Sequence, residues 1–401
     1  MPSFDRISPT TAAVWDQIIR RNALGAVECP ADPNAPCWCR SGEPWNECHR
    51  HRAELPELSI GQLDDLCRRD QPRMLCRHPA ASGESCSSLE AIGSHTIQRN
   101  GGLTHIAENS HVYSSKRSFE RIAKNAGKVT LEPLGIRQAS VFPGFCSRHD
   151  KALFDYAEHV DSPLDLRSCY LLSLRAAAFE LSTKETQIRL HRTKCRYVDQ
   201  GMPFEAQSRV QNLMWSWQEA MELGRRDIFA LSNRYMCMYD SEQDPLGLSV
   251  YAIRFDQILP LAASGAFAVE VDFDGRRLHD LRSSVLSCHV ALNIAVVGRT
   301  TCMVLAWFGG RRTAAAALVE SFKRIPDERK ASAATVLAME HLENFFCRPS
   351  WWDGLRDKDR QRLDEKIAGG LHEDRHADAL VEPDLHVVTA RVLSTFEFDG
   401  G

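Results

Sequence analysis

One short run of the chain brings four potential metal ligands close together. It places two cysteines one residue apart, passes through a Ser-Gly turn and ends in an adjacent Cys-His pair. Thiolate and imidazole are the ligands of structural zinc sites, which are tetrahedral with bonds of about 2.0–2.3 Å. The run is too short to bury a core, so bound metal would supply most of its folding free energy. We therefore expect a zinc ion on Cys37, Cys39, Cys48 and His49.

This run resembles the SEC-C motif, a small zinc module found at the C-terminus of the preprotein translocase ATPase and appended to many bacterial proteins. The four ligands fall at that family's ligand positions, and Ser41-Gly42 and Trp45 also match. Two positions depart from the family, with Trp38 where it usually has proline and Arg40 where it usually has glycine. Neither is a ligand. The resemblance implies a closed zinc site without an open position for chemistry, and a role in binding a protein or nucleic acid.

A second set of three cysteines and one histidine is spread over a longer segment. Nine residues separate Cys76 from Cys86, and Cys146 and His149 form a later Cys-x-x-His pair at the start of a stretch with helical periodicity. A pair on an opening knuckle and a pair on the first turn of a later helix is the arrangement of a treble-clef zinc site. We expect a second structural zinc ion here. Two alternatives stay open: the first two cysteines are small buried hydrophobic residues, or His78 replaces a cysteine.

The segment between these pairs contains Ser94-His95-Thr96-Ile97-Gln98 and resembles HNH endonucleases. In that family a histidine on a strand acts as general base, and an Asn or His beside the later zinc pair helps to hold a catalytic metal. His95 matches the base, and Asp150 falls at the metal-holding position. A neutral imidazole can take a proton from water, and a divalent ion can stabilise the phosphate and the leaving oxygen. The resemblance implies Mg²⁺- or Mn²⁺-dependent cleavage of phosphodiesters.

The resemblance to HNH enzymes is partial. Ser94 replaces the family's acidic residue, Gln98 replaces its proline, and the closing pair is Cys-x-x-His instead of Cys-x-x-Cys. These departures favour an alternative, a non-catalytic zinc-scaffolded protein that binds protein or nucleic acid. An open site shared by His95 and Asp150 would favour the enzyme. A site in which His95 joins the zinc ligands would favour the scaffold.

Two further histidines and a local excess of positive charge lie in the same region. His105 is expected on a short helix as a packing or capping residue, whereas His111 precedes a strand-like pair and could face the same cleft as His95. Residues 74–151 contain ten Lys or Arg against six Asp or Glu. The basic stretch from Lys116 to Lys128 either neutralises phosphates or forms a solvated loop.

The composition is that of an ordinary globular protein with room for two or three domains. The 401 residues are 43% hydrophobic and 25% charged, with a net charge of −4 that makes any polyanion site a local one. The chain shows neither an apolar run of membrane-spanning length nor a signal pattern, so we expect a cytoplasmic protein without membrane association. Cysteines that cluster with histidines are typical of metal ligands in a reducing compartment.

The periodicity predicts an α+β protein with two small zinc-stabilised N-terminal modules, a helical middle and a β-rich C-terminal domain. The expected domains are an N-terminal helix (1–25), the SEC-C-like module (26–55), the HNH-like treble-clef region (74–160), a helical segment (161–227) and an α+β domain of unknown function (228–401). Helices are expected at 10–24, 60–69, 166–181, 204–223 and 331–346, and strands at 230–238, 248–255, 267–273, 285–297 and 302–308. The C-terminal half shows no P-loop, dinucleotide fingerprint or nucleophile elbow.

Overall fold

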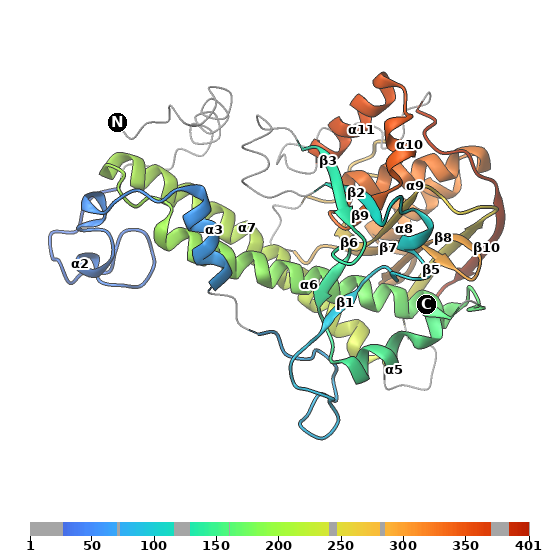
Figure 1. The fold of residues 1–401 in the computed structure, drawn as a ribbon, viewed down its shortest axis with the longest axis horizontal. Coiled ribbons are helices and arrows are strands. Elements are labelled where there is room, and N and C mark those ends of the chain that lie inside the picture. The colour runs from blue at the N-terminus through green and yellow to red at the C-terminus, as the bar shows by residue number, and fades with distance from the viewer. Residues whose placement is uncertain are drawn as a thin grey trace. The chain divides into compact units, whose positions relative to one another are not determined.

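The computed structural model describes residues 27–69, 73–115, 129–159, 161–239, 247–280, 285–369 and 385–400. These residues form a mixed α+β structure, which confirms the predicted fold class (Figure 1). The helix expected at 10–24 and the basic stretch from Lys116 to Lys128 lie outside the described residues. None of the helices in the described ranges combines the length and the apolar character that a membrane span needs.

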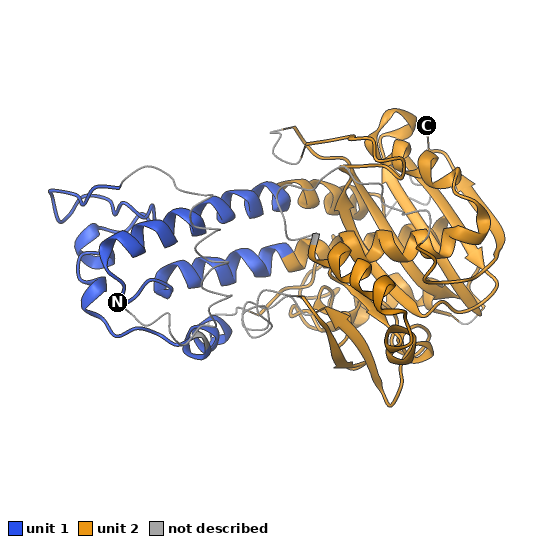
Figure 2. Ribbon diagram, turned by 90° about the horizontal axis from the view of Figure 1, so that it is seen from above, with its two compact units in different colours: residues 1–72, 118–128, 184–225 blue, residues 73–117, 129–183, 226–401 orange. Residues whose placement is uncertain are grey.

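The chain divides into two compact units, which Figure 2 colours separately. Unit 1 comprises residues 1–72, 118–128 and 184–225, and unit 2 comprises residues 73–117, 129–183 and 226–401. The two long helices, α6 (Leu166–Tyr197) and α7 (Phe204–Cys237), each contribute residues to both units.

Unit 1 combines short N-terminal elements with the turn between α6 and α7. Its elements before that turn are α2 (Trp45–Cys48), η2 (Arg52–Glu54) and α3 (Ile60–Arg69), the last of which matches the helix expected at 60–69. The turn contains Gly201 in a left-handed conformation, with φ of +79°. A Cβ atom there would lie 2.9 Å from the Leu55 carbonyl oxygen and 2.9 Å from the Glu57 backbone nitrogen. Only glycine therefore permits this close approach of two chain segments.

Unit 2 is built on an eight-stranded antiparallel sheet in the order β10-β5-β8-β7-β6-β9-β2-β3. Its strands are β2 (His111–Ser115), β3 (Leu131–Gly135), β5 (Leu248–Phe255), β6 (Leu261–Ala268), β7 (His289–Val297), β8 (Thr300–Phe308), β9 (Phe345–Cys347) and β10 (Val392–Phe398). The sheet thus takes strands from residues 111–135 as well as from the C-terminal half.

Side-chain alternation places the two faces of the sheet in two different cores. On β5, Tyr251 and Ile253 pack into the core that also holds α8, α9 and α11. Val250 and Ala252 point the other way, into the core that holds α5 and the unit 2 parts of α6 and α7. The helices that cover these faces are α5 (Ser147–Glu158), α8 (Ala314–Lys323), α9 (Asp327–His341), α10 (Pro349–Asp353) and α11 (Asp357–Gly369) (Figure 1).

Two of the predicted strands are wrong in whole or in part. Residues 230–237 belong to α7, because the apolar run there continues a helical face in which Ile228 and Tyr235, two turns apart, are both buried. A short apolar run does not distinguish helix from strand, so periodicity alone misassigned it. The strand expected at 267–273 overlaps only the end of β6. That strand begins earlier, at Leu261, in a run of small residues, and ends at Ala268. The helix expected at 331–346 ends at His341, and β9 follows.

Candidate metal centres and adjoining cleft

The first cluster consists of Cys37, Cys39, Cys48 and His49, whose ligand atoms all lie within 4.8 Å of one another. The Nδ1 atom of His49 is 3.3 Å from Cys37 Sγ and 3.1 Å from Cys48 Sγ, and the sulfurs of Cys39 and Cys48 are 3.6 Å apart. A tetrahedral ion with bonds of about 2.0–2.3 Å places its ligand atoms about 3.5–3.8 Å apart. The residues therefore fit a zinc ion.

A tight turn brings the first two cysteines back toward the second pair. The Cys37 backbone N–H donates to the Glu43 carbonyl oxygen over 2.9 Å. Between them the chain reverses through two left-handed residues, Arg40 with φ of +62° and Gly42 with φ of +83°. The short helix α2 then carries Cys48 at its end and His49 directly after it.

The sulfur atoms of this cluster influence one another's ionisation. The hydrogen bonds with Cys37 and then with Cys48 hold the pKa of the Cys39 thiol far below its usual range. The pKa of Cys37 is raised, first by its hydrogen bond with Cys39. Proton sharing of this kind favours a thiolate at one sulfur, which is the form that binds metal.

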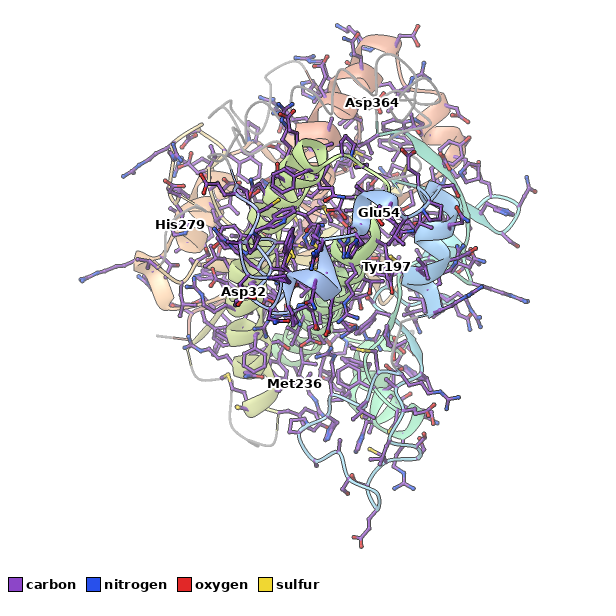
Figure 3. All side chains as sticks on the ribbon, turned by 90° about the vertical axis from the view of Figure 1, so that its left-hand side faces the viewer. Asp32, Glu54, Tyr197, Met236, His279 and Asp364 are labelled. Carbon is purple, nitrogen blue, oxygen red and sulfur yellow. The ribbon has the colours of Figure 1, made fainter. Side chains whose placement is uncertain are left out.

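The other side of the His49 ring meets a buried carboxylate. The Nε2 atom of His49 donates to Asp199 Oδ2 over 2.9 Å, and both side chains are almost completely buried, with 1% and 0% exposed. Figure 3 draws all side chains as sticks with sulfur in yellow and labels Asp32 and Glu54, which lie before and after the cluster in the sequence, and Tyr197, two residues before Asp199. No sequence motif marks Asp199, which lies 150 positions from His49 in a turn.

The second cluster consists of Cys76, Cys86, Cys146 and His149, again with all ligand atoms within 4.8 Å. The three sulfurs are 3.4, 3.6 and 3.4 Å from His149 Nδ1. This even spacing is what a tetrahedral ion with about 2.3 Å sulfur bonds requires. The structure also places the closing pair as expected, with Cys146 as the N-cap of α5 and His149 on its first turn.

Burial and local hydrogen bonds shift the thiol pKa values of Cys76 and Cys146 in opposite directions. Burial raises the pKa of Cys76 to about 11. Burial acts in the same direction on Cys146, but the His149 backbone N–H and hydrogen bonds from Ser87 outweigh it and lower the pKa to about 6. The start of α5 therefore favours the thiolate of Cys146 at neutral pH.

His78 lies beside the second cluster and is not one of its four ligands. Its ring stacks on the ring of His149, with centroids 3.9 Å apart and planes 5° from parallel. Its Nδ1 atom accepts the Ala80 backbone N–H over 3.1 Å. His78 is thus a neighbour of the histidine ligand, and the four ligands are those expected from the spacing.

The second cluster adjoins a small two-stranded sheet and a helix. Strand β1 (Gly93–His95) pairs antiparallel with β4 (Val141–Pro143), and His95 lies opposite Val141. Helix α5 follows β4 directly and carries Asp150 one residue after the ligand His149. The pairing of β1 with β4, which are separated in the chain by β2 and β3, therefore brings His95 and Asp150 to the same region from different elements.

A cavity of about 350 Å³ lies beside β1. Its lining includes both predicted catalytic residues, His95 and Asp150, and also Arg175 from α6, a residue that no sequence motif marks. The complete lining is Gly93, Ser94, His95, Gln98, Arg99, Asn100, Asp150, Glu158 and Arg175. The volume is near the lower end of the range for ligand pockets, about 300–1,000 Å³.

His95 is half-buried and oriented by one hydrogen bond. Its Nδ1 atom donates to the Ala139 carbonyl oxygen over 3.0 Å, which leaves Nε2 as the ring nitrogen with a free lone pair. Burial lowers the pKa of His95 and outweighs the opposing effects of that hydrogen bond and of the Asp150 charge. The imidazole is therefore neutral at neutral pH, and it is not part of the metal cluster.

Three polar atoms of the cavity-lining residues have no hydrogen-bond partner among the described residues. They are Asp150 Oδ1, Ser94 Oγ and Arg175 Nε, and all three atoms are buried. Buried polar atoms are normally paired, so an unpaired carboxylate oxygen is available for a cation or a water molecule. Arg175 is paired at its other end, since its Nη1 atom forms an ion pair with Glu158 and its guanidinium lies 3.7 Å from the centre of the Phe154 ring.

The other two histidines of this region lie outside the cavity lining. His105 is the last residue of the short helix η3 (Leu103–His105), and its carbonyl oxygen accepts the Arg348 side chain over 3.2 Å. His111 is exposed at the start of β2, where its Nδ1 donates to the Asn109 carbonyl oxygen over 2.7 Å. The idea that His111 faces the same cleft as His95 is therefore wrong.

No protein family matches the chain, and no curated protein or solved structure is significantly similar to it.

Proposed function

We propose that the protein is a metal-dependent, HNH-like nuclease whose cleft is formed by β1, β4 and α5. The observation that carries this proposal is the meeting of His95 and Asp150, from two different elements, in one cavity beside a cluster of three cysteines and one histidine. The pairing of β1 with β4 and the position of Cys146 and His149 at the start of α5 support the HNH-like assignment of residues 74–160. Zinc at the second cluster has the structural role of holding the segment with Cys76 and Cys86 to the start of α5.

Each residue of the cleft has a definite role in this proposal. His95 takes a proton from the attacking water through Nε2, since Nδ1 is committed to Ala139. Asp150 holds a Mg²⁺ or Mn²⁺ ion through the oxygen that lacks a hydrogen-bond partner. That ion supplies charge stabilisation for the phosphate and the leaving oxygen when it is bound. The substrate class is a phosphodiester of DNA or RNA.

Two single variants, one at His95 and one at His111, test this proposal. His95→Ala should abolish nicking of plasmid DNA in the presence of Mg²⁺ or Mn²⁺, because general-base catalysis contributes about 10²–10⁴-fold. His111→Ala is the matched control, since His111 is exposed and outside the cavity lining. Zinc content and thermal unfolding of both variants should equal those of the wild type. Nicking that is undiminished in His95→Ala would remove the nuclease proposal.

We further propose that residues 26–55 form a SEC-C-like module with a closed structural zinc site. All four ligand positions of the first cluster are provided by the protein, and none is left for a substrate. We propose that this module binds a protein or a nucleic acid. In this proposal the catalytic residues lie in the cleft beside the second cluster.

A second candidate function is a non-catalytic zinc scaffold that binds protein or nucleic acid. It is supported by the charge of the cleft, where Arg99 and Arg175 balance Asp150 and Glu158. It is also supported by exposed apolar side chains around the second cluster, namely Leu75 (64% exposed), Leu89 (52%) and Ile92 (41%). Binding of a labelled DNA oligonucleotide that is equal in wild type and His95→Ala, without cleavage by either, would favour the scaffold.

A further inference from the structure

The metal module of unit 1 contacts the turn between α6 and α7 through one of its own ligands. We propose that the module is an internal clamp on this helical hairpin, with Asp199 as the positioning residue for the ligand His49. Metal binding and the packing of the hairpin turn are then one coupled event. The proposal does not depend on nuclease activity; it rests on metal at the first cluster, which elemental analysis measures separately.

Asp199 is the centre of a buried hydrogen-bond network. Its side chain is 0% exposed. It accepts hydrogen bonds from His49 Nε2 over 2.9 Å, from Arg52 Nη1 over 2.8 Å and from Gln211 Nε2 over 2.9 Å. A buried carboxylate is costly unless it is paired and hydrogen-bonded. The network therefore has to be complete, and it draws its members from both the module and α7.

The chemistry of the ligand explains what Asp199 does. His49 faces the sulfurs with Nδ1, so the proton must reside on Nε2 for the ring to bind metal. Asp199 Oδ2 accepts that proton's hydrogen bond and thereby fixes both the tautomer and the ring orientation. Loss of such an outer carboxylate typically lowers metal affinity about 10–100-fold.

The two residues at which the run departs from the SEC-C pattern both contact α7. The Trp38 ring lies edge-on to Phe204, with centroids 5.6 Å apart, and 4.5 Å from the ring of His49. The Arg40 guanidinium lies 3.2 Å from the centre of the Trp215 ring, a cation–π contact. Arg40 adopts a left-handed conformation, with φ of +62°, in which the glycine usual at this position would be unstrained. The departures thus suit docking onto the hairpin.

Backbone contacts join the same two segments. The Gly201 N–H donates to the Arg52 carbonyl oxygen over 3.0 Å, and the Gln200 side-chain amide donates to the Pro56 carbonyl oxygen over 2.7 Å. The chain just after the ligand pair is therefore held to the turn by main-chain atoms as well as by Asp199. Loss of the metal would therefore affect the turn through these main-chain contacts and through Asp199.

The second cluster provides an internal comparison. It has the same ligand types and also binds through Nδ1, but the Nε2 atom of His149 has no hydrogen-bond partner among the described residues, and the ring is held by stacking on His78. A substitution at Asp199 should therefore act on one site and spare the other.

The experiment is a chelator titration of Asp199→Asn with hydrogen exchange as a second readout. The first site should release zinc at about 10–100-fold lower chelator concentration than in the wild type, while the second site is unchanged. Amide exchange of residues 195–211 should rise in the variant, and also in the wild type once the first site is emptied. Asp227→Asn is the control, because Asp227 is also buried and hydrogen-bonded, to Arg226 and Ser287, away from both clusters.

Two results would overturn the proposal. Unchanged zinc release in a folded Asp199→Asn protein would show that the carboxylate does not position the ligand. Unchanged exchange of residues 195–211 after zinc removal would show that the hairpin does not depend on the metal. Arg40→Gly keeps every ligand and tests the docking if Asp199→Asn does not fold: exchange around Phe204 and Trp215 should rise with zinc still bound, and exchange equal to the wild type would contradict the clamp.

Discussion

The ring of His95 has one nitrogen, Nδ1, hydrogen-bonded to the protein backbone, and its other nitrogen, Nε2, has a free lone pair. Its bond to Ala139 fixes the tautomer, and its half-buried position disfavours the charged form. Asp150 contributes an unpaired buried oxygen to the same cavity. At the scale of single residues, the cleft therefore combines a neutral base with an acceptor that has free capacity.

The lowered pKa of His95 predicts the acid side of the pH profile. Burial holds its pKa below the ordinary value of about 6.5, so the neutral base form persists to lower pH than for an exposed histidine. As pH falls, kcat/KM should therefore decline only below about 6.5. The measurement is a pH–rate profile of nicking at saturating Mg²⁺ or Mn²⁺. A decline centred above that value would contradict a neutral, buried base.

At the scale of elements, the hairpin of α6 and α7 contains two glycines in different surroundings. Gly201 sits in the turn with a positive φ and almost touches the backbone at Leu55 and Glu57. Gly224 lies inside α7, where the nearest atom to an added Cβ is Lys184 Cε at 3.7 Å. The same substitution should therefore have opposite effects at the two positions.

Gly201→Ala should lower the free energy of unfolding of unit 1, because left-handed strain costs about 1–2 kcal/mol and overpacking typically a further 1–3 kcal/mol. Gly224→Ala should instead stabilise the helix by about 0.5–1 kcal/mol, since alanine is the better helix former. Thermal or denaturant unfolding of the two variants checks both signs. A neutral Gly201→Ala would mean that the turn and the 55–57 segment separate easily.

Sequence patterns predicted local features well and distant pairings poorly. Both ligand sets, the helix at 60–69 and the strand at 248–255 follow from spacing and periodicity that a few neighbouring residues define. Residues 230–238 were misassigned because a short apolar run suits either helix or strand. Arg175 on α6 and Asp199 in the turn after α6 join their sites only through packing between segments far apart in the chain, and no local pattern marks such a residue.

At the scale of the whole molecule, the two metal clusters belong to different units. The first lies in unit 1 and the second in unit 2. Each therefore stabilises its own part of the chain, and loss of one need not empty the other. Metal content per chain is the direct measure of this independence.

Protein purified without chelator should contain two zinc ions per chain, in accordance with the two clusters. A variant with Cys146→Ser and His149→Ala should contain one, because these substitutions remove two of the four ligands of the second cluster. Elemental analysis makes the comparison, with Cys237→Ser, an exposed cysteine outside both clusters, as the control. One zinc ion in both wild type and double variant would confine metal to Cys37–His49.

The second cluster also joins parts of the chain that are far apart, as its ligands Cys86 and Cys146 bracket both β2 and β3. A bound ion would act as a cross-link that closes a loop of about 60 residues in the unfolded chain. By the relation used for disulfides, such a loop lowers the entropy of the unfolded state by the equivalent of about 4 kcal/mol. The last two strands at one end of the large sheet, β2 and β3, would then be tethered before they pair, so zinc should accelerate the completion of that sheet during folding.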